Sequence, residues 1–138
     1  MTTAIFPSLA NKTVVVTGGG SGIGAEIVAS FVRQKSRVFF LDVAEAESNA
    51  LVDRLQGAAK FLKCDLTNIA ALKDTFASIE KQAGNVSVLV NNAANDDRHK
   101  PADVTPAYWD DRIAVNLRHY FFAAQAVGVA EAVPTLVM

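Results

Sequence analysis

The chain alternates short runs in which apolar residues are concentrated with longer stretches in which apolar residues recur every three or four positions. The short runs cover 12–17, 37–43, 60–66 and 86–93 and are rich in β-branched and aromatic residues, which is typical of strands covered on both faces. The longer stretches, about 22–35, 45–56, 67–83 and 105–128, have helical periodicity. This alternation predicts an α/β fold built on a doubly wound parallel sheet with right-handed crossovers.

The predicted helices have recognisable faces and ends. In the first, Ile23, Ile27 and Phe31 recur four residues apart, so we expect this face to lie against the sheet. Short polar side chains that can accept a hydrogen bond from the first turn stand where two later helices begin. The expected N-caps are Thr67 or Asn68 for the third helix and Thr105, followed by Pro106, for the fourth.

Composition narrows the class of protein. The 138 residues are 51% apolar and carry a net charge of −1, which predicts one globular domain, 1–138, and disfavours nucleic acid as a partner. The single cysteine, Cys64, is expected in the core and fits a reducing cytoplasm. The first residues lack the pattern of a signal peptide. We therefore expect a cytoplasmic protein. No group of His, Cys, Asp or Glu has the spacing of a metal site, so we expect no bound metal ion.

The most apolar stretch of the chain, "IAVNLRHYFFAAQAVGVA", is interrupted by polar residues. Asn116, Arg118, His119 and Gln125 fall within it, so it predicts a packed helix and not a membrane span. His119 has no carboxylate at helical spacing. We expect this histidine on the helix surface.

A glycine-rich turn, "TGGGSGIG" at 17–24, joins the first strand to the first helix. Bare backbone at a helix N-terminus makes an anion site, because the first N–H groups are unpaired and a phosphate can approach closely. Eighteen residues after Gly24, at the end of the second strand, stands Asp42, where a carboxylate can accept from both ribose hydroxyls of a dinucleotide. The turn and Val43 offer no Arg or Lys. The pattern predicts NAD in preference to NADP, whose 2′-phosphate Asp42 would repel.

Four motifs taken together resemble the short-chain dehydrogenase/reductase family. They are "TGGGSGIG", "CDL" at 64–66, "NNAA" at 91–94 and "VN" at 115–116, and the resemblance covers 8–127. It implies a Rossmann-type sheet with strand order 3-2-1-4, truncated relative to the family. The segments "NNAANDDRHK", "YWDDRIAVNLRH" and "FFAAQAV" further resemble NAD-dependent sugar dehydrogenases of the D-xylose 1-dehydrogenase type within that family.

The resemblance implies roles for residues at the adenosine and pyrophosphate end of a cofactor. Gly18, Gly22 and Gly24 match the pyrophosphate turn, and Ile23 matches the residue that lies against the cofactor. Asp42 matches the acid that binds the ribose.

Further matches follow along the chain. Asp65 corresponds to the residue that meets the adenine amino group and Leu66 to its backbone neighbour. Asn91 matches an asparagine that steadies the central sheet, and Ala93 borders the ribose and nicotinamide. Asn116 matches the catalytic asparagine, which bends its helix and holds a water in a proton relay. Ala94 departs from the family's usual glycine.

The larger departure concerns catalysis. The family uses a serine and a Tyr-x-x-x-Lys pair that follow on the fifth strand and next helix, and this sequence reaches Met138 without them. Tyr108 is followed four residues on by Arg112, which keeps its proton, so this pair does not replace the missing one. Three functions therefore stay open: the cofactor-binding half of a sugar dehydrogenase that is inactive alone, a non-catalytic NAD-binding module, or a folded remnant without a ligand.

One polar segment and one apolar segment lie outside the four motifs. Asn95, Asp96, Arg98 and His99 follow the fourth strand and suit a sugar with many hydroxyls, although a solvated loop has the same composition. The apolar tail, Thr135–Met138, is expected to add in parallel beside Val86–Val90, either in its own chain or in a partner. Apolar faces left uncovered on the sheet and the fourth helix predict a homo-oligomer.

Overall fold

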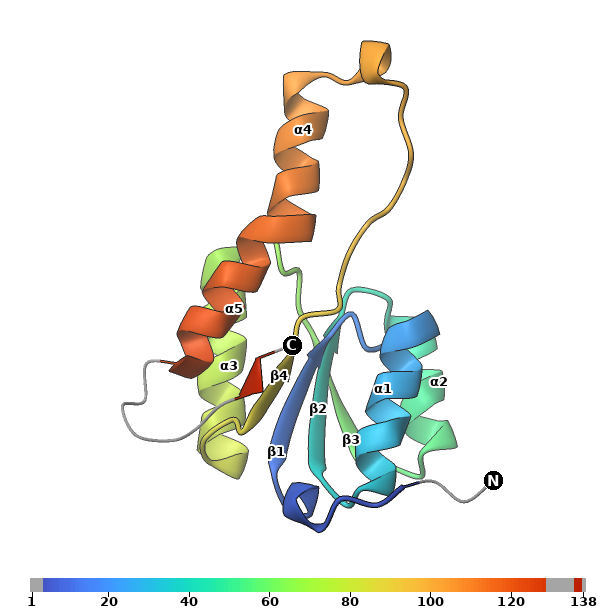
Figure 1. Ribbon diagram of the computed structural model, residues 1–138, viewed down its shortest axis with the longest axis vertical. Helices are drawn as coiled ribbons and strands as arrows, with labels where there is room; N and C mark the ends of the chain where they lie inside the picture. Colours follow the sequence, from blue (N-terminus) through green and yellow to red (C-terminus); the bar gives the residue numbers. More distant parts are fainter. Residues whose placement is uncertain (1–3, 129–135, 138) are drawn as a thin grey trace.

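The structure, a computed structural model, describes residues 4–128 and 136–137. Its sheet has the strand order β3-β2-β1-β4-β5, and every pair of neighbours is parallel (Figure 1). The order 3-2-1-4 expected from the sequence is confirmed. The strands are β1 (Thr13–Thr17), β2 (Arg37–Asp42), β3 (Ala59–Lys63), β4 (Val88–Val90) and β5 (Leu136–Val137). The α-helices are α1 (Gly22–Arg33), α2 (Glu45–Arg54), α3 (Ile69–Ala83), α4 (Pro106–Ile113) and α5 (His119–Gly128).

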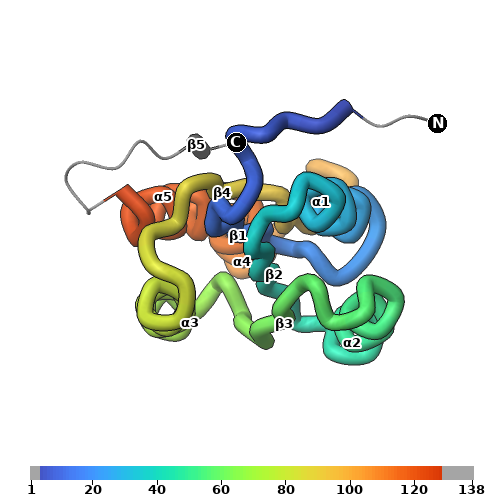
Figure 2. The backbone as a smooth tube through the Cα atoms, turned by 90° about the horizontal axis from the view of Figure 1, so that it is seen from below, coloured from blue at the N-terminus to red at the C-terminus, as the bar shows by residue number. Residues whose placement is uncertain are grey.

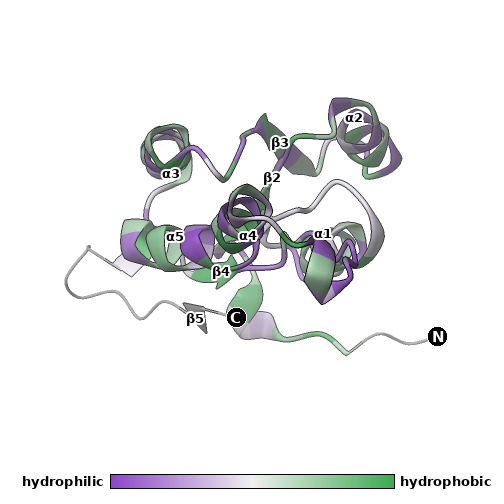
Figure 3. Ribbon diagram, turned by 90° about the horizontal axis from the view of Figure 1, so that it is seen from above, coloured by the Kyte–Doolittle hydropathy of each residue, from purple (hydrophilic) through white to green (hydrophobic). Residues whose placement is uncertain are grey.

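The sheet lies between two layers of helices, which explains why β1, β2 and β4 are buried along nearly all their length. Viewed along the strands, α1 and α2 lie on one side and α3 and α5 on the other (Figure 2). One core, under α1 and α2, contains Val14, Val16 and Phe40. The other, under α3 and α5, contains alternate residues such as Val15 and Leu41. The covering helices each show hydrophilic and hydrophobic residues (Figure 3), as amphipathic helices do.

The expected helix ends are largely confirmed. Asn68, and not Thr67, caps α3 by accepting a hydrogen bond from the N–H of Ala71 at 3.1 Å. Thr105 caps α4 in the same way, accepting from the N–H of Tyr108 at 3.2 Å. These contacts satisfy donors that a helix cannot pair internally.

The prediction of which residues of α1 face the sheet is wrong by about one position. Ile23 is 77% exposed, whereas Ala25 and Val28 are buried against the sheet. Ile27 and Phe31 are only partly buried at the border of that core. The small residues allow α1 to lie close to the strands, and Ile23 is left at the open end of the helix.

The long helix expected at 105–128 is interrupted. Between α4 and α5 lies a π-helical segment, η3 (Ala114–Arg118), which adds one residue to a turn. Ala114 and His119 are therefore both buried although they are five residues apart, and Ala123 and Val127 continue the same face at the normal spacing of four. The expectation that His119 lies on the surface is wrong, because the π turn rotates it inward.

The two helices on either side of η3 contact different parts of the fold. α5 packs against α3, while α4 rises past the end of the sheet (Figure 1). Within residues 4–128 and 136–137, no helix has the length and apolar character needed to cross a membrane.

The tail pairs with the fourth strand of its own chain. Val88 of β4 is in register with Leu136 of β5, and Leu89 with Val137, in parallel. The expectation of a short fifth strand beside Val86–Val90 is confirmed for these two residues. Thr135 and Met138 lie outside the described residues.

Candidate functional site

The glycine turn after β1 is packed so closely at Gly18 and Gly24 that a side chain cannot fit at either position. Gly18 has a φ of +64°, and a Cβ there would lie 2.7 Å from the Cα of Ala93. A Cβ on Gly24 would lie 1.9 Å from the carbonyl oxygen of Gly18. Ser21 is the N-cap of α1 but its side chain makes no capping hydrogen bond, and the first turn contains no acidic residue. The opening N–H groups of α1 can therefore receive an anion.

Two residues that the sequence analysis did not single out hold this turn in place. The side chain of Asn92 donates to the carbonyl oxygens of Thr17, at 3.1 Å, and of Gly18, at 2.9 Å. The hydroxyl of Thr17 accepts from the N–H groups of Asn92 and Ala93. The ends of β1 and β4 are thus tied together beneath the turn. Two features of the sequence could have indicated these residues: Thr17 ends the first predicted strand, and Asn92 is the second asparagine of "NNAA".

Asp42, at the end of β2, is fixed by the backbone. Its Oδ2 accepts from the N–H of Gly20 at 2.8 Å, and its Oδ1 accepts from Val43 at 2.8 Å and Ala44 at 3.0 Å. The side chain is half-buried and lines the cavity described below. A carboxylate has about four acceptor positions, so hydroxyl donors of a ligand can still bind.

Ser48 of α2 is a third residue that sequence reasoning missed. It is fully buried, and its Oγ has no hydrogen-bond partner among the described residues. A Cβ on Gly20 would lie 2.4 Å from this Oγ and 2.9 Å from the Oδ2 of Asp42. The third glycine of the turn is therefore required by the close approach of Ser48 and Asp42, which no motif spacing reveals.

One cavity of about 630 Å³ opens along the C-terminal ends of the strands. It brings together eight of the residues expected at a cofactor site, which come from the ends of all the first four strands. These are Gly18, Gly22, Ile23, Gly24, Asp42, Asp65, Leu66 and Ala93. Ser21, Val43, Cys64, Thr67, Asn92, Ala94, Asp96 and Val115 complete the lining. Asn91 and Asn116 do not line it.

The β3 side of the cavity is ordered by local hydrogen bonds. The Oδ1 of Asp65 accepts from the N–H of Thr67 at 2.9 Å and from its hydroxyl at 2.7 Å. Cys64 is buried, as expected. Burial raises the pKa of the Cys64 thiol, the nearby Asp65 carboxylate adds to this, and a hydrogen bond with Thr75 opposes it. The thiol is therefore held in its neutral form.

Asn116 lies in η3 and is bonded to the segment that follows β4. Its Oδ1 accepts from the N–H of Asn95 at 2.7 Å, and its Nδ2 donates to the carbonyl oxygen of Asn95 at 2.9 Å. Asn116 therefore joins the π-helical segment to the chain that follows β4. The contact fixes the chain beside the Ala93–Ala94 rim of the cavity.

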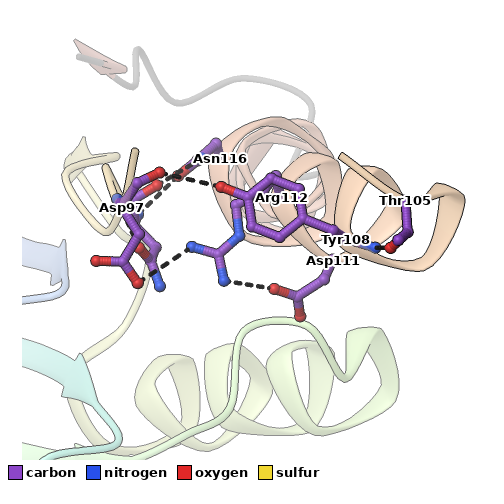
Figure 4. A network of polar contacts seen from close by, with 7 residues as sticks. Asp97, Thr105, Tyr108, Asp111, Arg112 and Asn116 are labelled. Atoms are coloured by element: carbon purple, nitrogen blue, oxygen red, sulfur yellow. Dashed lines mark hydrogen bonds and ion pairs between the residues drawn. The ribbon is translucent and has the colours of Figure 1, made fainter. Parts of the chain in front are cut away.

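The pair Tyr108 and Arg112 is structural in this fold. The Tyr108 hydroxyl donates to the carbonyl oxygen of Asp97 at 3.0 Å, and Arg112 lies 5.0 Å from the Tyr108 ring centre (Figure 4). Arg112 also contacts Asp111 at 2.7 Å and Asp97 at 3.8 Å. Neither residue lines the cavity. The His99 ring stacks on Tyr108 with 4.0 Å between centres.

Asn91 connects β4 with α5. Its Nδ2 donates to the carbonyl oxygen of Tyr120 at 3.3 Å, and the Tyr120 hydroxyl donates to the carbonyl oxygen of Ala93 at 3.0 Å.

His119, next to Tyr120, is fully buried, and burial lowers the pKa of its imidazole. Hydrogen bonds with the backbone of Val115 and Ala114 oppose this shift in part. In the part of the chain that the structure describes, no three His, Cys, Asp or Glu side chains are grouped to hold a metal ion.

Comparison with known proteins gives this geometry a context. Residues 12–130 match the short chain dehydrogenase family. The chain is 57% identical over 130 residues to a D-xylose 1-dehydrogenase of Caulobacter vibrioides, with 92% of this chain and 51% of that protein covered. It is 46% identical over 126 residues to a probable galactose dehydrogenase of Rhizobium meliloti, covering 88% and 49%.

Solved structures agree in fold. A mutant short-chain dehydrogenase/reductase of Serratia marcescens matches with a TM-score of 0.83 at 29% identity, covering 89% of this chain and 51% of that one. The ligand-free aldohexose dehydrogenase of Thermoplasma acidophilum matches with a TM-score of 0.75 at 33% identity, covering 88% and 45%. The chain spans about half the length of the relatives it matches. On the match over residues 12–130, the chain belongs to the short-chain dehydrogenase family.

Proposed function

We propose that this chain is the NAD-binding half of a dehydrogenase that oxidises a sugar hydroxyl. The observation that carries the proposal is the cavity in which a glycine-rich helix N-terminus and a backbone-anchored carboxylate, Asp42, face the same space. A dinucleotide needs these two features together, one for its pyrophosphate and one for its adenosine ribose. The membership of the short-chain dehydrogenase family implies an NAD(P) cofactor.

Each lining residue then has a role. Gly18, Gly22 and Gly24 let the pyrophosphate approach the first turn of α1, and exposed Ile23 packs on the cofactor. Asp42 accepts from the ribose hydroxyls. NAD, when bound, supplies the hydride acceptor at C4 of its nicotinamide.

The adenine and the nicotinamide ends of the cofactor are bordered by further residues. Asp65 and Leu66 contact the adenine, Ala93 borders the nicotinamide ribose, and Asn91 supports the rim through Tyr120. Asn116 holds the segment at Asn95 and is the catalytic asparagine of the proposed reaction.

Preference for NAD over NADP follows from charge at Asp42. A 2′-phosphate would bring about −1.5 to −2 charges against this carboxylate. In the described part of the chain, the cavity has no Lys or Arg among its lining residues to compensate. Lys63, in register with Asp42, is engaged at 2.7 Å with Glu45.

Turnover requires groups that this sequence does not contain. No Tyr-x-x-x-Lys occurs in it, and Tyr108 and Arg112 are occupied with Asp97 away from the cavity. The proposal therefore covers the reaction, a sugar substrate near Asn95–His99 and the activity of the whole protein. The missing pair favours a second candidate, a non-catalytic NAD-binding module. A remnant without a ligand is the third outcome that the test distinguishes.

We further propose that the chain self-associates. Trp109, Leu117 and Phe121 are 60–65% exposed along α4, η3 and α5. Exposed large apolar side chains on one helical arm favour association between copies.

Calorimetric titration with NAD and NADP tests the cofactor assignment. Wild type is compared with Asp42→Asn and with Asp53→Asn, an exposed acid on α2 outside the cavity. We expect NAD to bind more tightly than NADP, and Asp42→Asn to weaken NAD by roughly 1–2 kcal/mol, the scale of a hydrogen bond to a charged group. Asp53→Asn should match wild type. Equal binding of NADP contradicts the role of Asp42, and absence of NAD binding contradicts the first two candidates.

A further inference from the structure

Ser48 has a buried hydroxyl without a partner. The residue lies on α2 and is 0% exposed. Its Oγ makes no hydrogen bond within the part of the chain that the structure describes. A buried polar group in this state costs stability, and one explanation for it is a partner that is gained when the protein works. Ser48 does not line the cavity, so this partner is a group of the protein and not a ligand.

The space beside Gly20 is where this hydroxyl meets the candidate cofactor site. A Cβ on Gly20 would lie 2.4 Å from the Oγ of Ser48 and 2.9 Å from the Oδ2 of Asp42. The N–H of Gly20 donates to that Oδ2 at 2.8 Å. Gly20 therefore lies beside two oxygens, and its N–H is paired with only one of them.

The carboxylate of Asp42 cannot accept from two further hydroxyls without losing a backbone donor. Its Oδ1 accepts from the N–H groups of Val43 and Ala44, which the turn into α2 places there. Both acceptor positions of Oδ1 are thus filled by its own segment, and Oδ2 has one position left beside the Gly20 bond. The two hydroxyls of a ribose need two positions. Binding both of them at Oδ2 releases the N–H of Gly20.

The released N–H needs a new acceptor, because Gly20 is buried and a buried backbone donor without a partner is costly. The Oγ of Ser48 lies beside it, and a hydroxyl has two acceptor positions. We propose that Ser48 is a positioning residue for the adenosine ribose: its hydroxyl accepts the N–H of Gly20 when the ribose hydroxyls occupy the Oδ2 of Asp42. This inference rests on the proposed function, because the ribose of NAD causes the exchange.

The exchange favours a ribose over a deoxyribose at this position. A nucleotide with one hydroxyl on the sugar fits the position that Oδ2 still has, so the N–H of Gly20 stays on Asp42 and Ser48 is not needed. With two hydroxyls the exchange takes place and Ser48 contributes. The effect of Ser48 therefore depends on the number of hydroxyls on a sugar that it never touches, which a purely structural role does not predict.

The test is calorimetric titration of the 138-residue chain with NAD and with the analogue of NAD whose adenosine sugar lacks the 2′-hydroxyl. Wild type is compared with Ser48→Ala. The matched control is Ser36→Ala, because Ser36 is also buried but its Oγ donates to the carbonyl oxygen of Leu9 at 2.8 Å, at the end of β2 remote from the cavity. Urea unfolding of the three chains without ligand is measured alongside.

We expect Ser48→Ala to bind NAD about fivefold more weakly than wild type, as for loss of one hydrogen bond, and to bind the deoxy analogue as wild type does. Ser36→Ala should bind both ligands as wild type does but unfold at lower urea. Ser48→Ala should unfold at the same urea concentration as wild type or higher, because it loses an unpartnered hydroxyl.

Two results would overturn the inference while NAD still binds to wild type. One is an equal change in affinity for NAD and for the deoxy analogue in Ser48→Ala, including no change in either. The other is unfolding of Ser48→Ala at lower urea, because the hydroxyl would then already have a partner in the free protein. Absence of NAD binding to wild type refutes the proposed function itself, and the inference with it.

Discussion

The buried histidine of α5 makes folding stability depend on pH. His119 is fully buried at the start of α5, and burial lowers the pKa of its imidazole below the ordinary value of 6.5. The other histidine, His99, is exposed. The perturbation is His119→Leu, which removes the titrating group and keeps a side chain of comparable bulk on the face shared with Ala123.

The sign and limit of the effect follow from proton linkage. Above pH 6.5 both folded and unfolded chains hold this histidine neutral, so it contributes no pH dependence. As pH falls through 6.5 the unfolded chain binds a proton that the buried ring resists, and the free energy of unfolding decreases. One proton changes it by at most about 1.4 kcal/mol per pH unit. Between pH 7.5 and 5.5 the loss from His119 is therefore about 1.4 kcal/mol at most.

Urea unfolding at half-unit steps between these pH values measures the effect. Wild type and the control His99→Gln should lose stability toward pH 5.5, whereas His119→Leu should stay flat. Carboxylates titrate mainly below this range, so they add little. The same slope in wild type and His119→Leu would refute the argument, because the titrating group would then be another residue.

Three further changes test other parts of the structure. Gly24→Ala should lower the free energy of unfolding in urea by about 3 kcal/mol, because its Cβ would lie 1.9 Å from the Gly18 oxygen. The control Gly128→Ala, at a position with open space around it, should leave stability unchanged or raise it. Equal effects of the two substitutions would show that the turn is not tightly packed. Tyr108→Phe removes one hydrogen bond worth about 1 kcal/mol, so amide exchange at 95–97 should accelerate about fivefold by mass spectrometry, and unchanged exchange would contradict the clamp. Deletion of 136–138 uncovers β4 and should increase self-association in light scattering, which an unchanged molar mass would contradict.

The sheet could be predicted because several of its strands are apolar on both faces, but the strand ends could not. The apolar patterns at 60–66 and 86–93 are longer than β3 and β4. Leu66 is buried beyond the last paired residues of β3, and Cys64 adds only its N–H, which donates to the carbonyl oxygen of Asp42 at 3.1 Å, before the chain turns into the rim of the cavity. The hydrophobicity of a segment predicts that it is buried, but not that its backbone pairs with a neighbouring strand. At the rim of a site, residues can be buried without such pairing.

The helix faces show the other limit of the sequence. His119 looked like a surface residue because a regular helix places buried positions three or four apart, and one π turn changes that spacing to five. In the site, the place of Asp42 could be predicted from the end of its strand. Two of its three backbone donors, Val43 and Ala44, follow it directly in the chain. The N–H of Gly20 and the hydroxyl of Ser48 come from other segments, so only the folded arrangement reveals these two.

The anchoring of Asp42 has a consequence for the order of events in ligand capture. A carboxylate on a free side chain would lose rotational freedom when a nucleotide arrives, and its position would vary from one encounter to the next. Three N–H groups already hold this one. The entropy of ordering the side chain is therefore spent during folding, and a nucleotide meets the negative charge in one place on first contact. Discrimination at this point would appear in the association rate as well as in the lifetime of the complex.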